Sequence, residues 1–357
     1  MRIKALKRAL PDAGFDAYLV TSVTSVYYFT GFLDIRDAPI TLIVPVDQDP
    51  ILYVSELSSV AARDEAKNCT VKLVKLGEQF PDKILKELTM LNVKRVGFEA
   101  LLTHAFLKFT KALKKVSFEH NADLVWKFRK IKSDTEVAYI RRAAAMADVG
   151  VKTAREVLKP GIRECEVVAE AEYAMRSLGS EAFAFDTIVV SGSRSALPHG
   201  FCSTKKIQLG DLVIIDLGAV YRGYRSDTTR TIVVGKPSLR QSRIFNLVLT
   251  AQERAFKAIK AGVKAWQVDA NARGIIKRGG YGKYFIHGLG HGVGLDIHEP
   301  PKLAPKSRDV LSKGNVITNE PGVYIPEFGG VRIEDTVLVH ENRAERLTRS
   351  PHDLVKD

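Results

Sequence analysis

The sequence predicts an α/β chain of two domains, and three observations carry that prediction. Its 357 residues exceed the length of one typical domain and suit two. Apolar strand-like runs alternate with helical stretches through residues 1–124, which is the pattern of an α/β domain. The segment Ser133–Glu136 (Ser-Asp-Thr-Glu) has the residues of a capping box at the start of a helix. We therefore expect domains at 1–124 and 133–357, joined by a linker at 125–132.

The elements of the first domain follow from its apolar runs and turn residues. Residues 1–10 are basic but contain no uninterrupted apolar run, so they predict an amphipathic helix and not a signal peptide. Val, Ile, Tyr and Phe cluster in short runs bounded by turn residues, which is typical of strands. Strands are expected at 16–20, 39–45, 50–54 and 95–98, and helices at about 58–67 and 82–91. In the second domain, the helix that Ser133 caps should extend to about Val157.

Farther along the second domain, residues 212–235 predict a β-hairpin. Both halves of this segment are rich in Val, Ile, Thr and Tyr, which favour strands. Arg222-Gly223 lies between the halves and is a plausible two-residue turn. Such a turn makes Tyr221 face Tyr224, and this pair fixes the register of the whole hairpin.

Two aspartates of this hairpin carry the first functional signal. In the expected register Asp216 lies opposite Thr229, and Gly218 lies opposite Asp227. Because side chains alternate between faces, Asp216 and Asp227 become diagonal neighbours on one face, roughly 7–8 Å apart at the backbone. Carboxylates converging from that spacing repel each other unless a cation lies between them. The alternative is a solvated hairpin with ordinary surface aspartates, which the hydrophobic flanks disfavour.

Three further residues complete a set of potential metal ligands. His291 lies in a glycine-rich segment, and Glu320 and Glu334 follow in or beside strand-like runs. Two Asp, one His and two Glu suit hard or borderline divalent metals, not a thiolate zinc site. Four carboxylates carry enough charge for two divalent ions, an arrangement that can hold a bridging hydroxide. His287 lies four residues before His291, a spacing that suits zinc only on a helix. Gly288 and Gly290 disfavour a helix there, so we expect His287 to pack or to support a ligand.

In this order the motifs resemble those of the pita-bread metallopeptidases, the family of methionine aminopeptidase, aminopeptidase P and prolidase. The resemblance covers essentially the whole chain and implies an α/β (α+β) fold, with an amino-terminal creatinase-type α/β domain and a pita-bread catalytic domain. It implies that Asp216 chelates one divalent ion, that His291 and Glu320 hold a second, and that Asp227 and Glu334 bridge the two. Manganese, cobalt, zinc and iron all suit these ligands, so the identity of the metal stays open.

The resemblance also implies which residues act on a peptide. The segment 185–200 matches the family's first histidine motif through His199, and His298 matches its second histidine, beside the scissile bond. Both histidines would orient the substrate and stabilise the tetrahedral intermediate. A hydroxide that bridges the metals would attack the carbonyl carbon. Glu320 would take the water's proton and pass it to the leaving nitrogen.

Two basic residues are further candidates for substrate binding. Arg332 shares the face of Glu334 by the strand period of two, so we expect it to steady that carboxylate; a purely structural arginine is the alternative. Lys302 stands where prolidases of the family have an arginine that grips the free carboxylate of a dipeptide. Lysine supplies the charge without the bidentate fork, so strict selectivity for dipeptides stays open.

The resemblance implies an enzyme, a two-metal peptidase that cleaves the bond before proline, with Xaa-Pro dipeptides as the expected substrate. The amino-terminal domain and the short segment His298–Lys302 favour a prolidase, as does the absence of an extra amino-terminal insert. The alternatives are an aminopeptidase P acting on longer peptides, a methionine aminopeptidase, and a non-catalytic peptidase-like binding module. The intact metal ligands disfavour the binding module. A homodimer is the family expectation.

Composition bounds the partners and the location. The net charge of +13 is spread along both halves, without the concentrated stripe or module of a nucleic-acid-binding protein. No apolar stretch approaches the length needed to span a bilayer. The three scattered cysteines, Cys69, Cys165 and Cys202, indicate a reducing compartment. We therefore expect a cytoplasmic protein without nucleic-acid or membrane partners.

Overall fold

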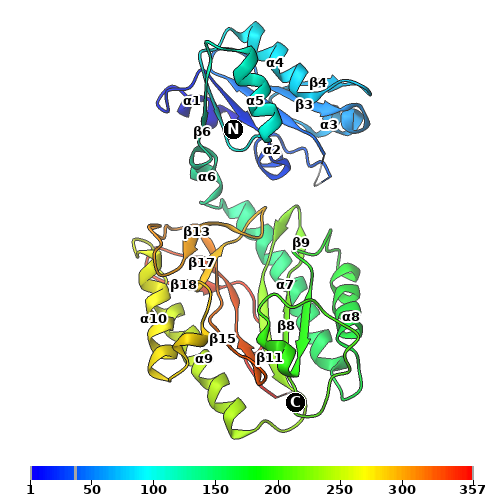
Figure 1. The fold of residues 1–357 in the computed structure, drawn as a ribbon, viewed down its shortest axis with the longest axis vertical. Coiled ribbons are helices and arrows are strands. Elements are labelled where there is room, and N and C mark those ends of the chain that lie inside the picture. The colour runs from blue at the N-terminus through cyan, green and yellow to red at the C-terminus, as the bar shows by residue number, and fades with distance from the viewer. Residues whose placement is uncertain (1, 36–37, 356–357) are drawn as a thin grey trace. The chain divides into compact units, whose positions relative to one another are not determined.

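The computed structural model describes residues 2–35 and 38–355, and the chain forms two compact units, Met1–Arg129 and Lys130–Asp357 (Figure 1). Each unit has its own sheets and its own hydrophobic core. The two units therefore have the organisation of separate domains.

The interval 125–132, which was expected to be a linker, contains the point of division but is not extended. Helix α6 (Asp123–Arg129) occupies most of it. Val125, Arg129 and Lys132 of this interval are buried.

The first unit is built on a six-stranded mixed sheet with the strand order β4-β3-β2-β1-β5-β6. The pairs β1–β2 and β2–β3 are antiparallel, while β1–β5, β3–β4 and β5–β6 are parallel. Its strands are β1 (Ala17–Val20), β2 (Thr41–Pro45), β3 (Ile51–Ser55), β4 (Thr70–Val74), β5 (Arg95–Phe98) and β6 (Ser117–His120). Its other helices are α1 (Arg2–Ala9), α2 (Val23–Thr30), α3 (Ser59–Glu65), α4 (Phe80–Leu91) and α5 (Thr103–Ala112). Each strand and helix that the sequence predicted for this unit is present.

The two strands that the sequence did not predict are those at the edges of this sheet. All residues of β1 and β2 are buried, whereas β4 is half-buried and β6 is largely exposed. An edge strand has fewer neighbours to cover it, so its sequence needs fewer apolar residues and looks less like a strand.

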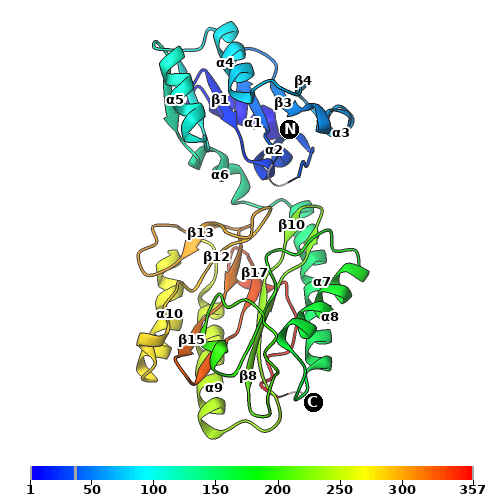
Figure 2. The same cartoon turned by 45° about the vertical axis from the view of Figure 1, so that its right-hand side comes forward.

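The second unit places two pairs of helices around its sheets. Helices α7 (Asp134–Val157) and α8 (Glu164–Ser177) lie on one side, and α9 (Leu239–Ala258) and α10 (Ala265–Arg278) on the other (Figures 1 and 2). One sheet has the order β11-β8-β7 and another the order β13-β12-β14-β17-β18. Their strands are β7 (Ile188–Ser191), β8 (Leu212–Leu217), β11 (Thr228–Val233), β12 (Gly290–Gly292), β13 (Glu299–Leu303), β14 (Val316–Asn319), β17 (Asp335–Val339) and β18 (Ala344–Arg346). Two short hairpins pair β9 (Val220–Tyr221) with β10 (Tyr224–Arg225), and β15 (Gly322–Ile325) with β16 (Gly329–Arg332).

Helix α7 begins where the capping box predicted. The Ser133 side chain accepts from the Glu136 N–H, and the Ser133 N–H donates to the Glu136 carboxylate at 2.9 Å. The apolar stripe of α7 contains Ala147, Val151 and Ala154, which pack with residues of α8 and β8 in one core cluster. This packing fixes the sheet that carries Asp216.

The hairpin also has the predicted register. Tyr221 pairs with Tyr224, and Asp216 pairs with Thr229. The turn residues Arg222 and Gly223 have φ values of 51° and 75°, as a hairpin turn with both central residues left-handed requires. The ladder is interrupted between the two pieces of the hairpin, where the Asp227 N–H donates to the Thr336 hydroxyl at 3.0 Å. This bond ties the hairpin to β17.

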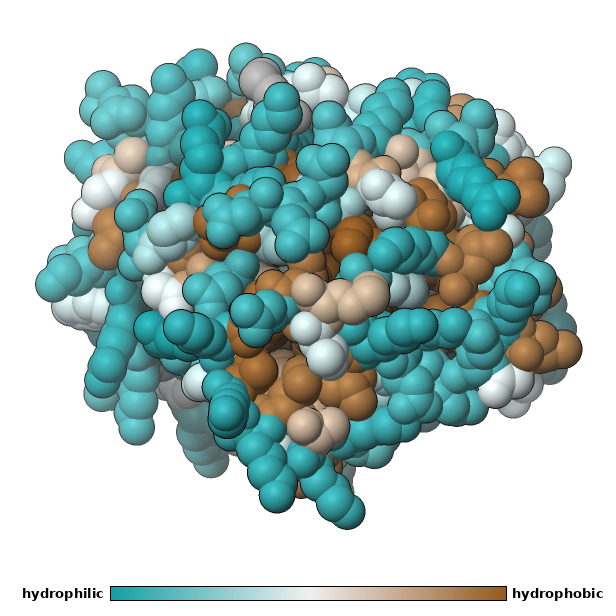
Figure 3. All heavy atoms as spheres, turned by 90° about the horizontal axis from the view of Figure 1, so that it is seen from above, coloured by the Kyte–Doolittle hydropathy of each residue, from teal (hydrophilic) through white to brown (hydrophobic). Residues whose placement is uncertain are grey.

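The surface of the molecule combines polar and apolar areas. One face is mostly hydrophilic, with apolar side chains gathered between the polar ones (Figure 3). In the first unit Leu57 and Leu76 are almost fully exposed. Within the described residues, no helix is long and apolar enough to cross a membrane.

Candidate active site

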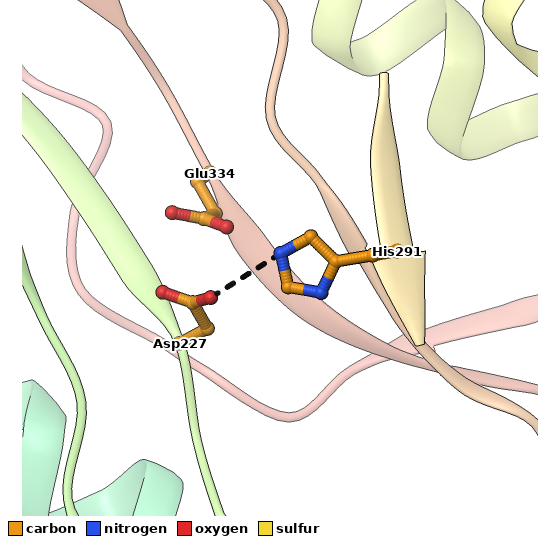
Figure 4. Close-up of side chains that lie close together, drawn as sticks. All are labelled: Asp227, His291 and Glu334. Carbon is orange, nitrogen blue, oxygen red and sulfur yellow. Dashed lines mark ion pairs between the residues drawn. The ribbon is translucent and has the colours of Figure 1, made fainter. Parts of the chain in front are cut away.

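Three side chains from three different segments converge in the second unit. Asp227 lies just before β11, His291 lies in β12, and Glu334 lies between β16 and β17. One ligand atom of each lies within 4.8 Å of the others. Figure 4 shows the two carboxylates and the imidazole pointing toward one another, with His291 Nε2 at 3.7 Å from Asp227 Oδ2. The sequence had assigned all three residues to a metal site.

The other two sequence-predicted ligands lie against this cluster. His291 Nε2 is 3.3 Å from Glu320 Oε1, and Glu320 directly follows β14. Asp216 in β8 is close enough to act on the charge of Asp227 and Glu334. The structure therefore brings together all five residues that the motifs had pointed to.

The carboxylates of this cluster differ in how readily they ionise. Burial raises the pKa of Asp227 well above its usual range, and the neighbouring charge of Glu334 raises it further. Burial also raises the pKa of Glu334, with added repulsion from Glu320 and Asp216. For Glu320 burial acts the same way, but the hydrogen bond and charge of His291 outweigh it and lower the pKa to about 2. The protein therefore does not supply enough positive charge to offset the burial and repulsion that disfavour ionisation of Asp227 and Glu334.

Asp216 has one oxygen with a partner and one without. Its Oδ2 accepts from Arg332 Nη2 at 2.6 Å, whereas its Oδ1 is buried with no hydrogen-bond partner. A buried carboxylate oxygen without a partner is unfavourable unless a cation or donor reaches it. The orphaned oxygen and the mixed carboxylate–imidazole donors fit divalent metal ions.

Arg332 bonds directly to Asp216 and reaches Glu334 through a threonine. Its guanidinium donates to Asp216 at 2.6 Å, to the Thr229 hydroxyl at 3.0 Å and to the Tyr324 hydroxyl at 2.7 Å. The Thr229 hydroxyl in turn donates to Glu334, and the positive charge of Arg332 offsets part of the rise in the pKa of Glu334. A role of Arg332 in substrate binding remains a prediction.

Three threonines support the cluster, and sequence reasoning missed them. The Thr229 hydroxyl donates to Glu334 Oε2 at 2.6 Å, and the Thr318 hydroxyl donates to Glu320 Oε1 at 3.0 Å. The Thr336 hydroxyl donates to the backbone carbonyl of Asp227 at 2.7 Å. Each threonine lies two residues from one of the five proposed ligand residues, but only Thr318 donates to the carboxylate at that spacing. The contacts of Thr229 and Thr336 join different segments, so the spacing alone could not have predicted them.

The two candidate substrate histidines lie on loops near the cluster. His298 precedes β13, and its ring centroid is 4.3 Å from that of His291, in an edge-to-face arrangement. Partial burial, then the nearby charges of His291 and His199, lower the pKa of His298. His199 is exposed on the loop after β7. His287 donates to or accepts from the Tyr324 hydroxyl at 3.0 Å and packs on Phe285, the packing role expected for it.

Lys302 lies in β13, four residues after His298. Its backbone N–H donates to Asp309 at 2.9 Å, and its side chain is exposed to solvent. The ammonium is therefore available to a ligand, and its role in substrate binding remains a prediction.

Comparison with known proteins places this geometry in a family. The model of metallopeptidase family M24 matches residues 138–341, and the model of the Creatinase/Prolidase N-terminal domain matches residues 2–131. The chain belongs to metallopeptidase family M24. The resemblance inferred from the motifs is thereby confirmed, as is the fold class, a creatinase-type domain followed by a pita-bread domain.

Individual M24 proteins are similar to this chain along its entire length. The Xaa-Pro dipeptidase of Pyrococcus furiosus is 45% identical over 355 residues, which cover 99% of each protein. The solved structure of the prolidase from Pyrococcus horikoshii OT3 has a TM-score of 0.93 at 41% identity, covering 99% of both chains. The X-Pro aminopeptidase from Thermotoga maritima MSB8 has a TM-score of 0.91 at 34% identity, again covering 99% of both chains.

Proposed function

We propose that this M24 protein is a metal-dependent Xaa-Pro dipeptidase, which hydrolyses the bond before proline in dipeptides. The observation that carries the proposal is the similarity to the Pyrococcus furiosus Xaa-Pro dipeptidase, 45% identical over 99% of both proteins. The convergence of Asp227, His291 and Glu334 in the second unit supports it, because these groups are suited to metal-assisted hydrolysis.

Two divalent ions are the proposed cofactor. Asp216 would hold one ion, His291 and Glu320 the other, and Asp227 and Glu334 would bridge them. When bound, such ions lower the pKa of water and polarise the substrate carbonyl. The raised pKa values of Asp227 and Glu334 support this assignment, since each carboxylate is buried beside others without enough positive charge.

The side chains around the ligands have separate proposed tasks. Glu320 Oε1 would accept a proton from the attacking water and return it to the proline nitrogen as the bond breaks. The Thr318 hydroxyl, 3.0 Å from that oxygen, fixes the orientation of the carboxylate. His298, whose pKa is lowered, and His199 would orient the peptide and donate hydrogen bonds to the developing oxyanion. Lys302 would pair with the free carboxylate of the dipeptide.

Metal identity, assembly and location complete the proposal. Manganese, cobalt, zinc or iron would all suit the oxygen and nitrogen donors. We infer a homodimer as the functional form and the cytoplasm as the location. The three cysteines are free in the structure, which supports a reducing compartment.

A second candidate function is an Xaa-Pro aminopeptidase that removes residues from longer peptides. The similarity to the Thermotoga maritima X-Pro aminopeptidase, with a TM-score of 0.91 at 34% identity, favours it. Lys302 favours it too, because an ammonium lacks the bidentate fork that an arginine offers to a dipeptide carboxylate.

One assay distinguishes these functions. The protein is incubated with Mn²⁺ or Co²⁺ and with Met-Pro, Met-Pro-Ala or Met-Ala-Ser, and each reaction is repeated after EDTA treatment. We expect Met-Pro to be cleaved with the highest kcat/KM and EDTA to abolish cleavage. Preference for Met-Pro-Ala would identify the aminopeptidase instead, and preference for Met-Ala-Ser a methionine aminopeptidase. Cleavage of none of the three would refute a peptidase function.

A further inference from the structure

Helix α8 begins with a fully buried glutamate that the proposed chemistry does not use. The side chain of Glu164 has no exposed surface and forms an ion pair with Arg194, from Nε to Oε2, at 3.2 Å. A buried carboxylate is unfavourable unless its charge and its lone pairs are matched. The partners that match this one therefore indicate what it holds.

The Glu164 carboxylate accepts five hydrogen bonds, all from the segment between Ser191 and Ser203. Oε1 accepts from the N–H and the hydroxyl of Ser191, both at 2.8 Å. Oε2 accepts from the N–H of Ser203 at 3.1 Å, from its hydroxyl at 2.7 Å and from Arg194 at 3.2 Å. Ser191 ends β7, and Ser203 follows it by twelve residues. One carboxylate thus holds both ends of the loop Gly192–Cys202.

This loop carries His199. Arg194, fixed by Glu164 at its Nε, donates from Nη2 to the Phe201 carbonyl at 2.6 Å and so ties the two arms of the loop together. Arg332, which holds Asp216, donates to the Pro198 carbonyl at 3.3 Å, directly before His199. The loop is therefore fixed at its base by Glu164 and near its tip by a residue of the candidate metal centre.

Capping α8 does not require Glu164. Two residues with exposed side chains, Arg163 and Glu166, cap the start of this helix. The Glu166 carboxylate accepts from the Arg163 N–H at 2.7 Å and from the Arg163 guanidinium at 3.0 Å. Helix α8 therefore has its own capping residue, and the buried carboxylate is left to the loop.

We propose that Glu164 is a positioning residue for the peptidase reaction, which holds the Gly192–Cys202 loop so that His199 faces the substrate. This inference rests on the proposed function, because it assigns Glu164 an effect through His199. In Glu164→Gln the NH2 group of the amide would point at N–H and hydroxyl donors of the loop, which need an acceptor. These donors would lose their hydrogen bonds, so the base of the loop would open.

The test is a double-mutant cycle with Glu164→Gln and His199→Ala, using Met-Pro hydrolysis by the metal-loaded protein. Glu164→Gln alone should lower kcat/KM roughly tenfold or more, as for other groups that orient a functional side chain. In the His199→Ala background the same change should lower it less than about twofold, because the residue it positions is already gone. Glu166→Gln, whose side chain is 44% exposed, is the matched control and should leave kcat/KM unchanged. Equal losses in both backgrounds would overturn the proposal.

Hydrogen exchange gives a readout that needs no activity. Amides of residues 193–202 should exchange roughly tenfold faster in Glu164→Gln than in Glu166→Gln, while those of β8 and β11 keep the wild-type rate. Unchanged exchange in the loop would refute the positioning role, even if the wild-type protein failed to cleave Met-Pro and the proposed function fell. Should Glu164→Gln not fold, Ser203→Ala removes one of the five bonds and should produce a smaller change of the same sign.

Discussion

Two consecutive buried carboxylates, Glu334 and Asp335, have pKa values that are shifted in opposite directions. Their relative exposures are 2% and 0%, so burial alone opposes ionisation of both. Burial and the repulsion of Glu320 and Asp216 raise the pKa of Glu334 well above its usual range. For Asp335 the charge of Arg230 and the hydrogen bond from His352 outweigh burial and lower the pKa. The difference lies in the partners and not in the depth of burial.

The partners of the two side chains explain the contrast. Asp335 lies 2.8 Å from Arg230, 3.0 Å from Arg346 and 3.0 Å from His352, so the protein itself supplies its positive charge. Glu334 accepts from the Thr229 hydroxyl, and the repulsion of Glu320 and Asp216 together with burial outweighs the positive charge of Arg332 nearby. A buried carboxylate surrounded by cations from the same chain serves the fold. One that faces other carboxylates leaves its charge to be balanced by a cation from solution.

The largest effect should follow from removing the charge that the protein does not balance. Glu334→Gln keeps the shape of the side chain but removes a proposed bridging ligand. It should lower kcat roughly 10²–10³-fold, which corresponds to a loss of several kcal/mol of transition-state stabilisation. The free energy of unfolding without metal should stay the same or rise, since less buried charge remains. Asp227→Asn should behave alike, and wild-type turnover in either variant would refute the ligand assignment.

The converse substitution should damage the fold. Asp335→Asn removes the carboxylate that pairs with Arg230, whose relative exposure is only 1%, and leaves that guanidinium buried without its main counter-charge. Loss of one partner of a buried ion pair should lower the free energy of unfolding by about 3–5 kcal/mol. Urea unfolding measures this change, with the exposed Asp353→Asn as control. Equal stability of the two variants would contradict the structural role of Asp335.

The contrast also predicts how pH acts on stability without metal. Because the folded pKa values of Asp227 and Glu334 are raised, the folded state binds more protons than the unfolded state between the unfolded and folded pKa values. In that window the free energy of unfolding falls as pH rises, by up to about 1.4 kcal/mol per pH unit for each group. Asp335, whose pKa is lowered, contributes stability that is lost only as pH falls.

Urea unfolding of the EDTA-treated protein at pH 5, 6 and 7 tests this sign. Glu334→Gln is the matched control and should reduce the downward slope, because one of the two titrating carboxyls is gone. Saturating Mn²⁺ should reverse the slope, because metal binding requires deprotonated ligands. A slope of the EDTA-treated wild type that is no more negative than that of Glu334→Gln across this range would contradict the raised pKa of Glu334.

The smallest effect should come from the exposed edge of the site. Lys302→Ala should raise KM for Met-Pro while sparing Met-Pro-Ala, whose carboxylate lies one residue farther away. The dipeptide should lose about 1–3 kcal/mol of binding free energy, as for a hydrogen bond to a charged group. Lys302→Arg should match or improve dipeptide binding because a guanidinium holds both carboxylate oxygens. An unchanged KM in Lys302→Ala would assign carboxylate recognition to another basic residue.

Local patterns predicted much of the fold and of the candidate site. The capping box located the start of α7, and the turn at Arg222-Gly223 fixed the hairpin register that places Asp216 opposite Thr229. Both are properties of adjacent residues or of a single two-residue turn. The five proposed ligand residues followed from their residue types and from the resemblance of the ordered motifs to the pita-bread family, and the structure brings these residues together.

Contacts between distant segments could not be predicted in this way. Arg332 reaches Asp216, 116 residues earlier, and Glu164 reaches Ser203, 39 residues later. Such pairs depend on how β8, β16 and α8 pack, which no local periodicity records. The edge strands β4 and β6 were missed for a related reason, because partial exposure weakens their apolar pattern.

Metal content measures the central claim most directly. The wild-type protein, dialysed against excess Mn²⁺ and then freed of unbound metal, should retain two divalent ions per chain by elemental analysis. Asp335→Asn, if folded at the assay temperature, should retain the same number, whereas Glu334→Gln should retain fewer, and EDTA should abolish Met-Pro hydrolysis. One tightly bound ion or none in the wild type, with activity unaffected by EDTA, would contradict the account.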